Sequence, residues 1–152
     1  MIRLATPADE PAIRLCAERA YGRYIAAIGK RPAPMDADFL ALIAAGQLYL
    51  SVDADAHLQG YIAFYPQTDA MLLESVAVLP EAAGRGVGKA LIQFCEDSAQ
   101  RLGLRAVQLY TNEKMSDNLA IYPRLGYRET GRRSEDGFHR VFFEKLVSRH
   151  KQ

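Results

Sequence analysis

Cysteine and long apolar runs are scarce in this sequence, and each scarcity excludes a class of protein. The 152 residues include two cysteines and no tryptophan. Cys16 and Cys95 fall on apolar faces of expected helices and show no metal-ligand spacing, so we expect buried free thiols and no metal site. The apolar runs are too short to span a bilayer, and the N-terminus lacks the features of a signal peptide. We therefore expect a cytoplasmic protein without a membrane-spanning segment.

An excess of charge of one sign is also missing. The 19 basic and 18 acidic residues leave a formal net charge of +1. Such a balance gives no electrostatic reason to expect a nucleic acid or a membrane surface as a partner. The length and the 49% hydrophobic fraction suit one globular domain, which we expect to span residues 1–152.

A glycine-rich segment follows an apolar one in the middle of the chain. Residues 72–79 are rich in Val and Leu and predict a buried strand, which Pro80 ends. Gly84, Gly86 and Gly88 follow, and apolar residues then recur at helical spacing. The unpaired N–H groups of a helix N-terminus can surround a phosphate where no side chains intervene. A tight turn that needs glycine only for its geometry is the alternative.

Two common phosphate-binding motifs do not fit this segment. A Walker loop requires Ser or Thr after its Gly-Lys pair, but Ala90 follows Gly88 and Lys89. A Rossmann fingerprint requires G-x-G-x-x-G within a βαβ repeat, whereas the glycines here follow G-x-G-x-G. A nucleotide-binding P-loop protein is therefore disfavoured.

Two segments together resemble the motifs of a known family. Residues 76–91, VAVLPEAAGRGVGKAL, resemble the acyl-CoA-binding motif of the GCN5-related N-acetyltransferases, the GNAT family. Residues 118–127, NLAIYPRLGY, resemble that family's closing motif, an aromatic-rich helix that ends in Leu-Gly-Phe or Leu-Gly-Tyr. The motifs occur in the family's order, and the resemblance covers nearly the whole chain. It implies direct transfer of an acetyl group, in a ternary complex, from acetyl-CoA to a primary amine of a small molecule or peptide, without a metal.

Periodicity and the resemblance together predict a mixed α/β (α+β) fold. We expect a central, mostly antiparallel sheet of six or seven strands with about four flanking helices. The unit that runs from the strand at 72–79 through the next helix to the following strand should be parallel and right-handed. Expected strands lie at residues 2–4, 47–52, 57–64, 72–79, 105–111, 127–130 and 140–145, and expected helices at 7–21, 36–45, 86–102 and 116–125.

The resemblance assigns acetyl-CoA to the glycine-rich loop and to the strand before it. The amides of residues 84–89 would bind the diphosphate, and the backbone of Val76 and Val78 would pair with the pantetheine arm. The amide of Val76 would face the thioester carbonyl. Ala83 departs from the family, which usually has Arg or Gln there, and Arg85 would compensate. The implied cofactor-binding residues are Val76, Ala77, Val78, Ala83, Gly84, Arg85, Gly86, Val87, Gly88, Lys89 and Asn118.

The resemblance also implies two catalytic residues. Tyr122 stands four residues before Gly126, where the family's general acid stands, and a phenol with a reference pKa of ~10 can protonate the leaving thiolate. Glu74 is a carboxylate in an otherwise apolar strand and can accept the amine's proton, directly or through water. Each has a structural alternative, as does Asn118, which could serve helix packing alone. His139 is a weaker candidate, because a lone histidine is more often structural or exposed.

The acceptor is the least specified partner. Protein N-termini, lysines, amino acids, polyamines and antibiotics are all served by this scaffold, and a fold does not choose among them. The irregular stretch 21–35 and the charged segment 131–137, which we expect to be a loop, are the regions that could shape an acceptor site. A homodimer is a further implication of the resemblance. The runner-up function is an acyl-CoA-binding regulatory or interaction module on the same fold, without catalysis.

Overall fold

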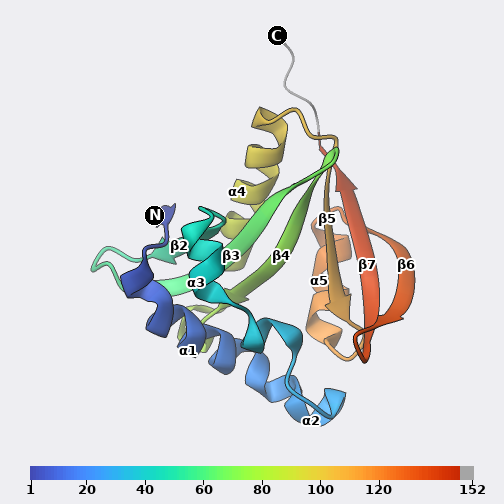
Figure 1. Ribbon diagram of the computed structural model, residues 1–152, viewed down its shortest axis with the longest axis horizontal. Coiled ribbons are helices and arrows are strands. Elements are labelled where there is room, and N and C mark those ends of the chain that lie inside the picture. The colour runs from blue at the N-terminus through green and yellow to red at the C-terminus, as the bar shows by residue number, and fades with distance from the viewer. Residues whose placement is uncertain (148–152) are drawn as a thin grey trace.

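The computed structural model describes residues 1–147, in which seven strands form one sheet with helices on both faces (Figure 1). The strand order is β1-β2-β3-β4-β5-β7-β6, with β4 and β5 parallel and the other pairs antiparallel. The strands are β1 (Ile2–Leu4), β2 (Leu48–Val52), β3 (Leu58–Gln67), β4 (Ala70–Val78), β5 (Ala106–Asn112), β6 (Arg128–Glu135) and β7 (Phe138–Leu146). The helices are α1 (Glu10–Tyr21), the single turn α2 (Ile25–Ile28), α3 (Phe39–Ala44), α4 (Val87–Arg101) and α5 (Ser116–Arg124). The predicted architecture is confirmed; residues 148–152 of the expected domain lie outside the described residues.

Two hydrophobic clusters, one on each face of the sheet, hold the layers together. Successive strand residues point to opposite faces, so Tyr61 packs in the cluster under α1 and α3 while Ile62 packs in the cluster under α4 and α5. Phe39 of α3 meets Tyr61 edge to face, with ring centroids 5.6 Å apart. Leu91 of α4 is fully buried in the other cluster. Burial of these apolar side chains is the main stabilising contribution to the fold.

The two cysteines lie in different clusters, and the prediction of buried free thiols is confirmed. Cys16 belongs to the cluster under α1 and Cys95 to the cluster under α4. Burial raises the pKa of the Cys16 thiol to about 12, so this thiol remains protonated at neutral pH. In the described part of the chain, every helix is too short or too polar to serve as a transmembrane span.

A β-bulge interrupts the pairing of β3 with β4 and shifts the faces of β4. Ala63 pairs with Ser75 and the next residue, Phe64, pairs with Leu73, so Glu74 is an extra residue without a partner on β3. We call the cluster under α4 and α5 the α4 cluster and the cluster under α1 and α3 the α1 cluster. Before the bulge, Leu73 packs in the α4 cluster. After the bulge, Val76 packs in the α4 cluster and Ala77 in the α1 cluster. The period-two alternation of β4 therefore changes phase at Glu74.

The two parallel strands separate just before the bulge. β4 and β5 pair only where residues 70–72 of β4 meet residues 106–108 of β5. Beyond this point the two strands diverge and leave an opening in the middle of the sheet (Figure 1). The second half of β4 therefore has a hydrogen-bonded neighbour, β3, on one side only.

The charged segment 131–137 is not a loop, and this prediction was wrong. It lies within an antiparallel hairpin of β6 and β7, whose pairing runs out to Glu135 and Phe138. The turn consists of Asp136 and Gly137, which both have positive φ. Two central residues with positive φ suit a tight hairpin turn, and Asp-Gly is a strong signal for it. The segment was missed because β6 is exposed along most of its length and lacks the apolar alternation that marks a buried strand.

The connection between α1 and β2 is more ordered than its composition suggests. The stretch 21–35, expected to be irregular, contains two short 3-10 segments and the single turn α2. The helix expected from residue 36 begins at Phe39, because the Asp38 carboxylate caps it by accepting the Ala41 N–H at 3.0 Å.

Gly60 tests how closely β3 must approach β4. A Cβ at Gly60 would lie 2.6 Å from the backbone oxygen of Ala77, which cannot move without disturbing the ladder. We expect Gly60→Ala to lower the free energy of unfolding by about 1–3 kcal/mol, measured by urea denaturation. Gly131→Ala, in an exposed strand with open space around the new Cβ, is the matched control and should change it by less than about 0.5 kcal/mol. Equal effects of the two substitutions would contradict this account of β3–β4 packing.

Candidate active site

Two adjoining cavities meet at the opening between β4 and β5. The glycine cleft, about 600 Å³, lies between α1, the glycine-rich loop, α4 and α5. The aromatic pocket, about 400 Å³, lies between the α2–α3 connection, β4, β5 and β7. Both volumes are in the range of small-molecule sites. Four residues line both cavities and mark their junction: Tyr21, Val76, Asn118 and Tyr122.

The glycine-rich loop presents a row of unpaired amides to the cleft. Gly84 and Gly86 both have φ of +78°, a conformation that other residues adopt only at a cost. Gly86 is the N-cap residue of α4, whose first turn leaves its N–H groups without helical partners. Within residues 1–147, the amides of residues 84–89 make no hydrogen bond to backbone or side chain. These donors and the positive end of the α4 dipole form a site for an anion such as a diphosphate.

Not all residues of the glycine-rich loop line the cleft with their side chains. A Cβ at Gly88 would lie 3.4 Å from the Val78 side chain, which is an ordinary contact, so the packing of α4 on β4 does not by itself require glycine there. Lys89 is exposed at the rim of the cleft. Ala83 also lines the cleft and offers it only a methyl group. Arg85 is exposed but is not among the residues that line the cleft, so its compensation for Ala83 stays a prediction.

The second half of β4 directs alternate peptide groups into the opening. Neighbouring residues of a strand direct their N–H and C=O groups to opposite sides. The Leu79 N–H bonds back to Gln59 of β3, which places the peptide groups of Val76 and Val78 on the opposite side, toward β5. The Tyr21 hydroxyl donates to the Val76 carbonyl at 2.6 Å, which leaves the Val76 N–H facing the junction.

Ala77 and Val87 contribute to the cleft in a different way. Ala77 pairs with Tyr61 of β3, and its buried side chain packs in the α1 cluster, so its peptide group faces away from the opening. Val87 begins α4, and its side chain is buried in the α4 cluster. Both line the cleft, but of the two only Val87 offers it an unpaired amide.

Tyr122 lies at the junction with a free hydroxyl. Its side chain is 6% exposed and packs against the rings of Tyr127 and Phe143, with centroids 5.6 and 5.8 Å away. The hydroxyl makes no hydrogen bond within residues 1–147. Every fully buried polar side-chain atom of these residues has a hydrogen-bond partner, so the Tyr122 hydroxyl is not fully buried. The hydroxyl must therefore reach the cavity surface. Burial raises the pKa of Tyr122 above its ordinary value, so the phenol keeps its proton at neutral pH.

Asn118 stands one helical turn before Tyr122 on α5. Its Nδ2 donates to the Thr111 hydroxyl of β5 at 3.1 Å and lies 3.6 Å from the Met115 sulfur. These contacts tie α5 to the end of β5, as the packing alternative requires. The Oδ1 atom makes no hydrogen bond in the described part of the chain, so the amide can also accept one from a molecule at the junction.

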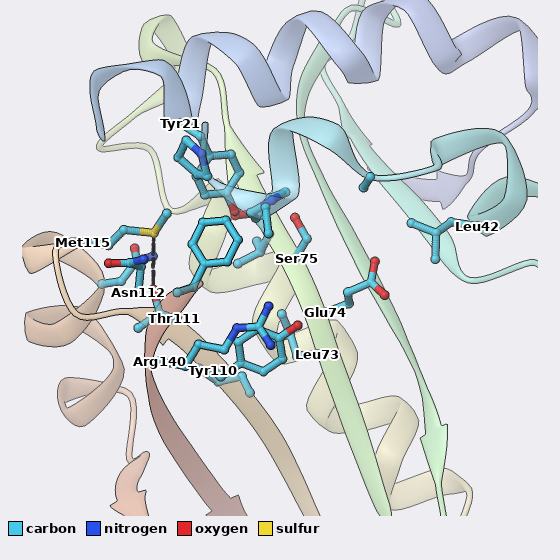
Figure 2. A pocket seen from close by; sticks show the side chains of 18 of the residues that line it. Tyr21, Leu42, Leu73, Glu74, Ser75, Tyr110, Thr111, Asn112, Met115 and Arg140 are labelled. Carbon is cyan, nitrogen blue, oxygen red and sulfur yellow. Dashed lines mark hydrogen bonds between the residues drawn. The ribbon is translucent and has the colours of Figure 1, made fainter. Parts of the chain in front are cut away.

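Glu74 is placed in the aromatic pocket by the bulge that it forms. Its carboxylate accepts a hydrogen bond from the Tyr65 hydroxyl of β3 at 3.0 Å. Glu74 lines the pocket (Figure 2). Burial, followed by this contact with the carboxylate, raises the pKa of Tyr65 to about 12. Tyr65 therefore donates to Glu74 throughout the neutral range and fixes the direction of the carboxylate.

Sequence reasoning missed three residues of the site and proposed one that does not belong to it. Tyr21 was not predicted to reach the junction, nor were Tyr110 of β5 and Arg140 of β7 predicted to line the aromatic pocket. The alternation of β7 could have found Arg140, because Phe138 and Arg140 share the face opposite the buried core residues. His139 is exposed on the hairpin, where its Nδ1 lies 2.8 Å from the Ser134 hydroxyl, and it lines neither cavity.

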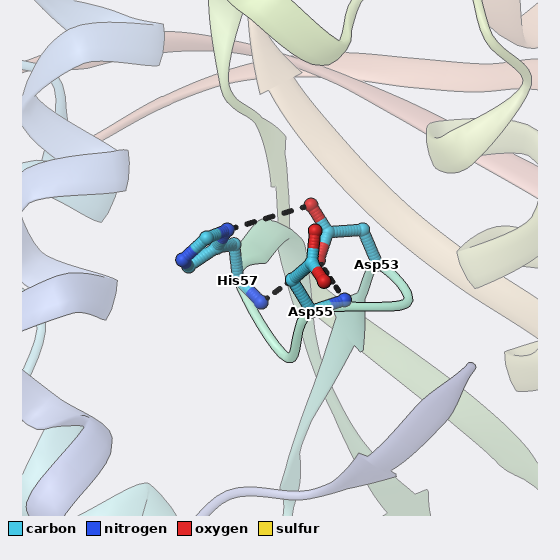
Figure 3. Close-up of side chains that lie close together, drawn as sticks. All are labelled: Asp53, Asp55 and His57. Atoms are coloured by element: carbon cyan, nitrogen blue, oxygen red, sulfur yellow. Dashed lines mark hydrogen bonds and ion pairs between the residues drawn. The ribbon is translucent and has the colours of Figure 1, made fainter.

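Three side chains outside both cavities resemble a metal-ligand set. Asp53, Asp55 and His57 lie together in the exposed turn between β2 and β3 (Figure 3). Asp53 Oδ1 accepts the N–H groups of Asp55 and His57 at 2.9 and 3.0 Å, and the His57 N–H is the main cause of the lowered pKa of Asp53. These bonds close the turn and explain why the side chains gather there.

The sequence matches known acetyltransferases. The model of the Acetyltransferase (GNAT) family matches residues 7–127. Over 52 residues, the chain is 46% identical to the mycothiol acetyltransferase of Pseudarthrobacter chlorophenolicus. The aligned stretch covers 34% of this chain and spans only 16% of the length of that protein.

The fold matches solved acetyltransferase structures over almost the whole chain. The PaiA N-acetyltransferase of Thermoplasma acidophilum, in complex with coenzyme A, is similar with a TM-score of 0.79 and 18% identity, covering 97% of this chain and 98% of that chain. The ribosomal-protein-S18-alanine N-acetyltransferase of Escherichia coli is similar with a TM-score of 0.74 and 18% identity, covering 100% and 96%. At such identities the likeness concerns the fold alone, and it confirms the mixed α/β fold that the sequence predicted.

Proposed function

The chain belongs to the acetyltransferase (GNAT) family, and on this premise we propose that it transfers an acetyl group from acetyl-CoA to a primary amine. One observation carries the proposal: the glycine cleft and the aromatic pocket meet at the free hydroxyl of Tyr122. Direct transfer between two bound substrates requires that their binding sites meet at the reacting atoms. The names of similar proteins include a protein alanine and mycothiol, which supports an amine of a small molecule or a peptide as the acceptor.

The glycine cleft fits the co-substrate in two ways. The unpaired amides of residues 84–89 and the N-terminus of α4 suit a diphosphate, and Lys89 adds a positive charge at the rim. The open side of β4 suits an extended chain with amide groups, because Val76 and Val78 direct their peptide groups toward it. The Val76 N–H then stands at the junction, where it would stabilise negative charge that develops on the thioester oxygen.

Two residues would move the protons of the reaction. The amine nitrogen bonds to the acetyl carbon as the carbon–sulfur bond breaks, giving an N-acetyl amine and CoA. Glu74 would accept a proton from the amine, directly or through water, from its place in the aromatic pocket. Tyr122 would give its proton to the leaving sulfur, for which its protonated state and its free hydroxyl are suited. The pair supports catalysis over mere binding of an acyl-CoA.

Gly86 tests the binding of the diphosphate. Gly86→Glu would place a carboxylate among the loop amides and strain a backbone with φ of +78°. We expect CoA affinity, measured by isothermal titration calorimetry, to fall by about 100-fold or more, since like charges repel at short range. Gly103→Glu is the matched control, because Gly103 has φ of +74°, equally open surroundings and a place at the opposite end of α4. Normal CoA affinity of the Gly86 variant would remove the loop from the binding site.

Tyr122 tests the assignment of the general acid. We expect Tyr122→Phe to lower kcat roughly 100-fold, because general acids typically contribute that much or more, and to leave CoA affinity within about twofold. Tyr127→Phe is the matched control: its ring packs against Tyr122, but its hydroxyl donates to Glu96 at 2.8 Å. The control should lose stability and keep its turnover. Wild-type turnover by the Tyr122 variant would mean that the thiolate takes its proton elsewhere.

Glu74 tests the assignment of the proton acceptor. An alkylamine has a reference pKa of ~10, so little of it is unprotonated at pH 7. We expect Glu74→Gln to lower kcat/KM about 10- to 100-fold at pH 7 and to lose much of this deficit near pH 9.5, where free amine is supplied by the solution. The measurement is the pH profile of CoA release for both proteins. A deficit that is the same at both pH values would assign Glu74 to structure instead.

A further inference from the structure

The aromatic pocket contains one cation among its lining residues within 1–147, and this cation is held in place. Arg140 lies on β7 with its side chain 12% exposed. Its guanidinium stands 4.3 Å from the ring centroid of Tyr110 and 5.8 Å from that of Phe138. Aromatic rings around a guanidinium fix its plane and reduce its contact with water. Figure 2 shows Arg140 beside Tyr110, with Glu74 on the opposite side of the pocket.

The hairpin uses only one nitrogen of this guanidinium. Arg140 Nη1 lies 3.2 Å from Glu135 and 3.8 Å from Asp136, both near the β6–β7 turn. These acids are 39% and 84% exposed, so water and salt screen the two ion pairs. The pairs orient the guanidinium but leave most of its donors unused.

The other two nitrogens form a free fork. Nε and Nη2 of Arg140 make no hydrogen bond within the described residues. Every fully buried polar side-chain atom of these residues has a partner, so these two nitrogens are not fully buried. Both nitrogens therefore remain accessible, on a side chain that lines the pocket. Nε–H and the adjacent Nη2–H point in parallel, which is the geometry that binds both oxygens of a carboxylate.

From this fork we propose that the acceptor is an amine that also carries a carboxylate, as an amino acid does. The inference rests on the proposed acetyl transfer and narrows its acceptor. The carboxylate binds Nε and Nη2 of Arg140, while the amine lies toward Glu74 and the junction. The carbon skeleton packs against apolar lining residues such as Pro34, Leu42 and Phe138. Polyamines are disfavoured, because their second ammonium group would meet the guanidinium.

Amines that differ in whether they carry a carboxylate test this inference. The series 6-aminohexanoate, hexylamine and 1,6-diaminohexane places a carboxylate, a methyl group or an ammonium on similar chains, and phenylalanine with 2-phenylethylamine gives a second pair. We expect the acids to have kcat/KM values about 10- to 100-fold above those of the uncharged amines, and the diamine to be poorest. A wild-type protein that prefers the uncharged or dicationic members would overturn the proposal.

Variants of Arg140 test whether this residue causes the preference for amines that carry a carboxylate. Arg140→Gln should reduce the ratio of kcat/KM between acid and uncharged amine to within about twofold, and Arg140→Lys, which keeps the charge but not the fork, should give an intermediate ratio. Arg133→Gln is the matched control: this arginine lies on the same hairpin over the Phe142 ring and outside both cavities. Thermal unfolding and CoA affinity show whether each variant is folded. An acid preference that survives Arg140→Gln would refute the assignment.

A binding measurement separates this inference from the proposed function. Calorimetry follows the binding of 6-aminohexanoate and phenylalanine to the protein saturated with CoA. If no amine releases CoA from acetyl-CoA, the proposed function fails; acid binding that is lost in Arg140→Gln would still support the carboxylate site. If amines are acetylated but the wild type neither binds nor prefers the acids, the function stands and this inference fails.

Discussion

The separation of β4 from β5 is the constraint on which the site depends. Two parallel strands that stayed paired would close the middle of the sheet. Here they pair over three residues only, and Glu74 then enters β4 as an extra residue. The bulge changes the phase of the strand, so Val76 turns to the α4 face and Glu74 lines the aromatic pocket. The extra residue Glu74 thus lies where β4 separates from β5, where the edge of β4 becomes free, and it places its own carboxylate beside the opening.

The two sides of the opening are built from different groups, main-chain donors on one side and side chains on the other. On one side, the glycine-rich loop and α4 supply main-chain donors, for which no particular side chain is needed. On the other side, side chains from β5 and β7 give the aromatic pocket its shape and charge. Tyr122 stands between them, held by rings of the α4 cluster while its hydroxyl stays free. The main-chain half suits a co-substrate shared by a family, and the side-chain half suits an acceptor that differs between members.

The parts that followed from sequence were those with a local cause. Glycines at spacing two before an amphipathic helix predicted the loop, and apolar alternation predicted most strands, because each pattern reflects a neighbouring backbone. The bulge could not be read in this way, since an extra residue without a partner is a property of the pairing with β3. The outer half of the β6–β7 hairpin was missed, because this part of β6 is exposed and carries charge instead of apolar alternation. Arg140 went unnoticed for a related reason: its role depends on Tyr110, which lies on another strand.

The central claim is that one passage through the sheet joins two substrates at Tyr122. A crystal structure of the protein with CoA tests it most directly. The account predicts the diphosphate on the amides of residues 84–89, the pantetheine arm along Val76 and Val78, and the sulfur within hydrogen-bond reach of the Tyr122 hydroxyl. Coenzyme A bound outside the glycine cleft, or a sulfur that lies away from the opening between β4 and β5, would contradict it.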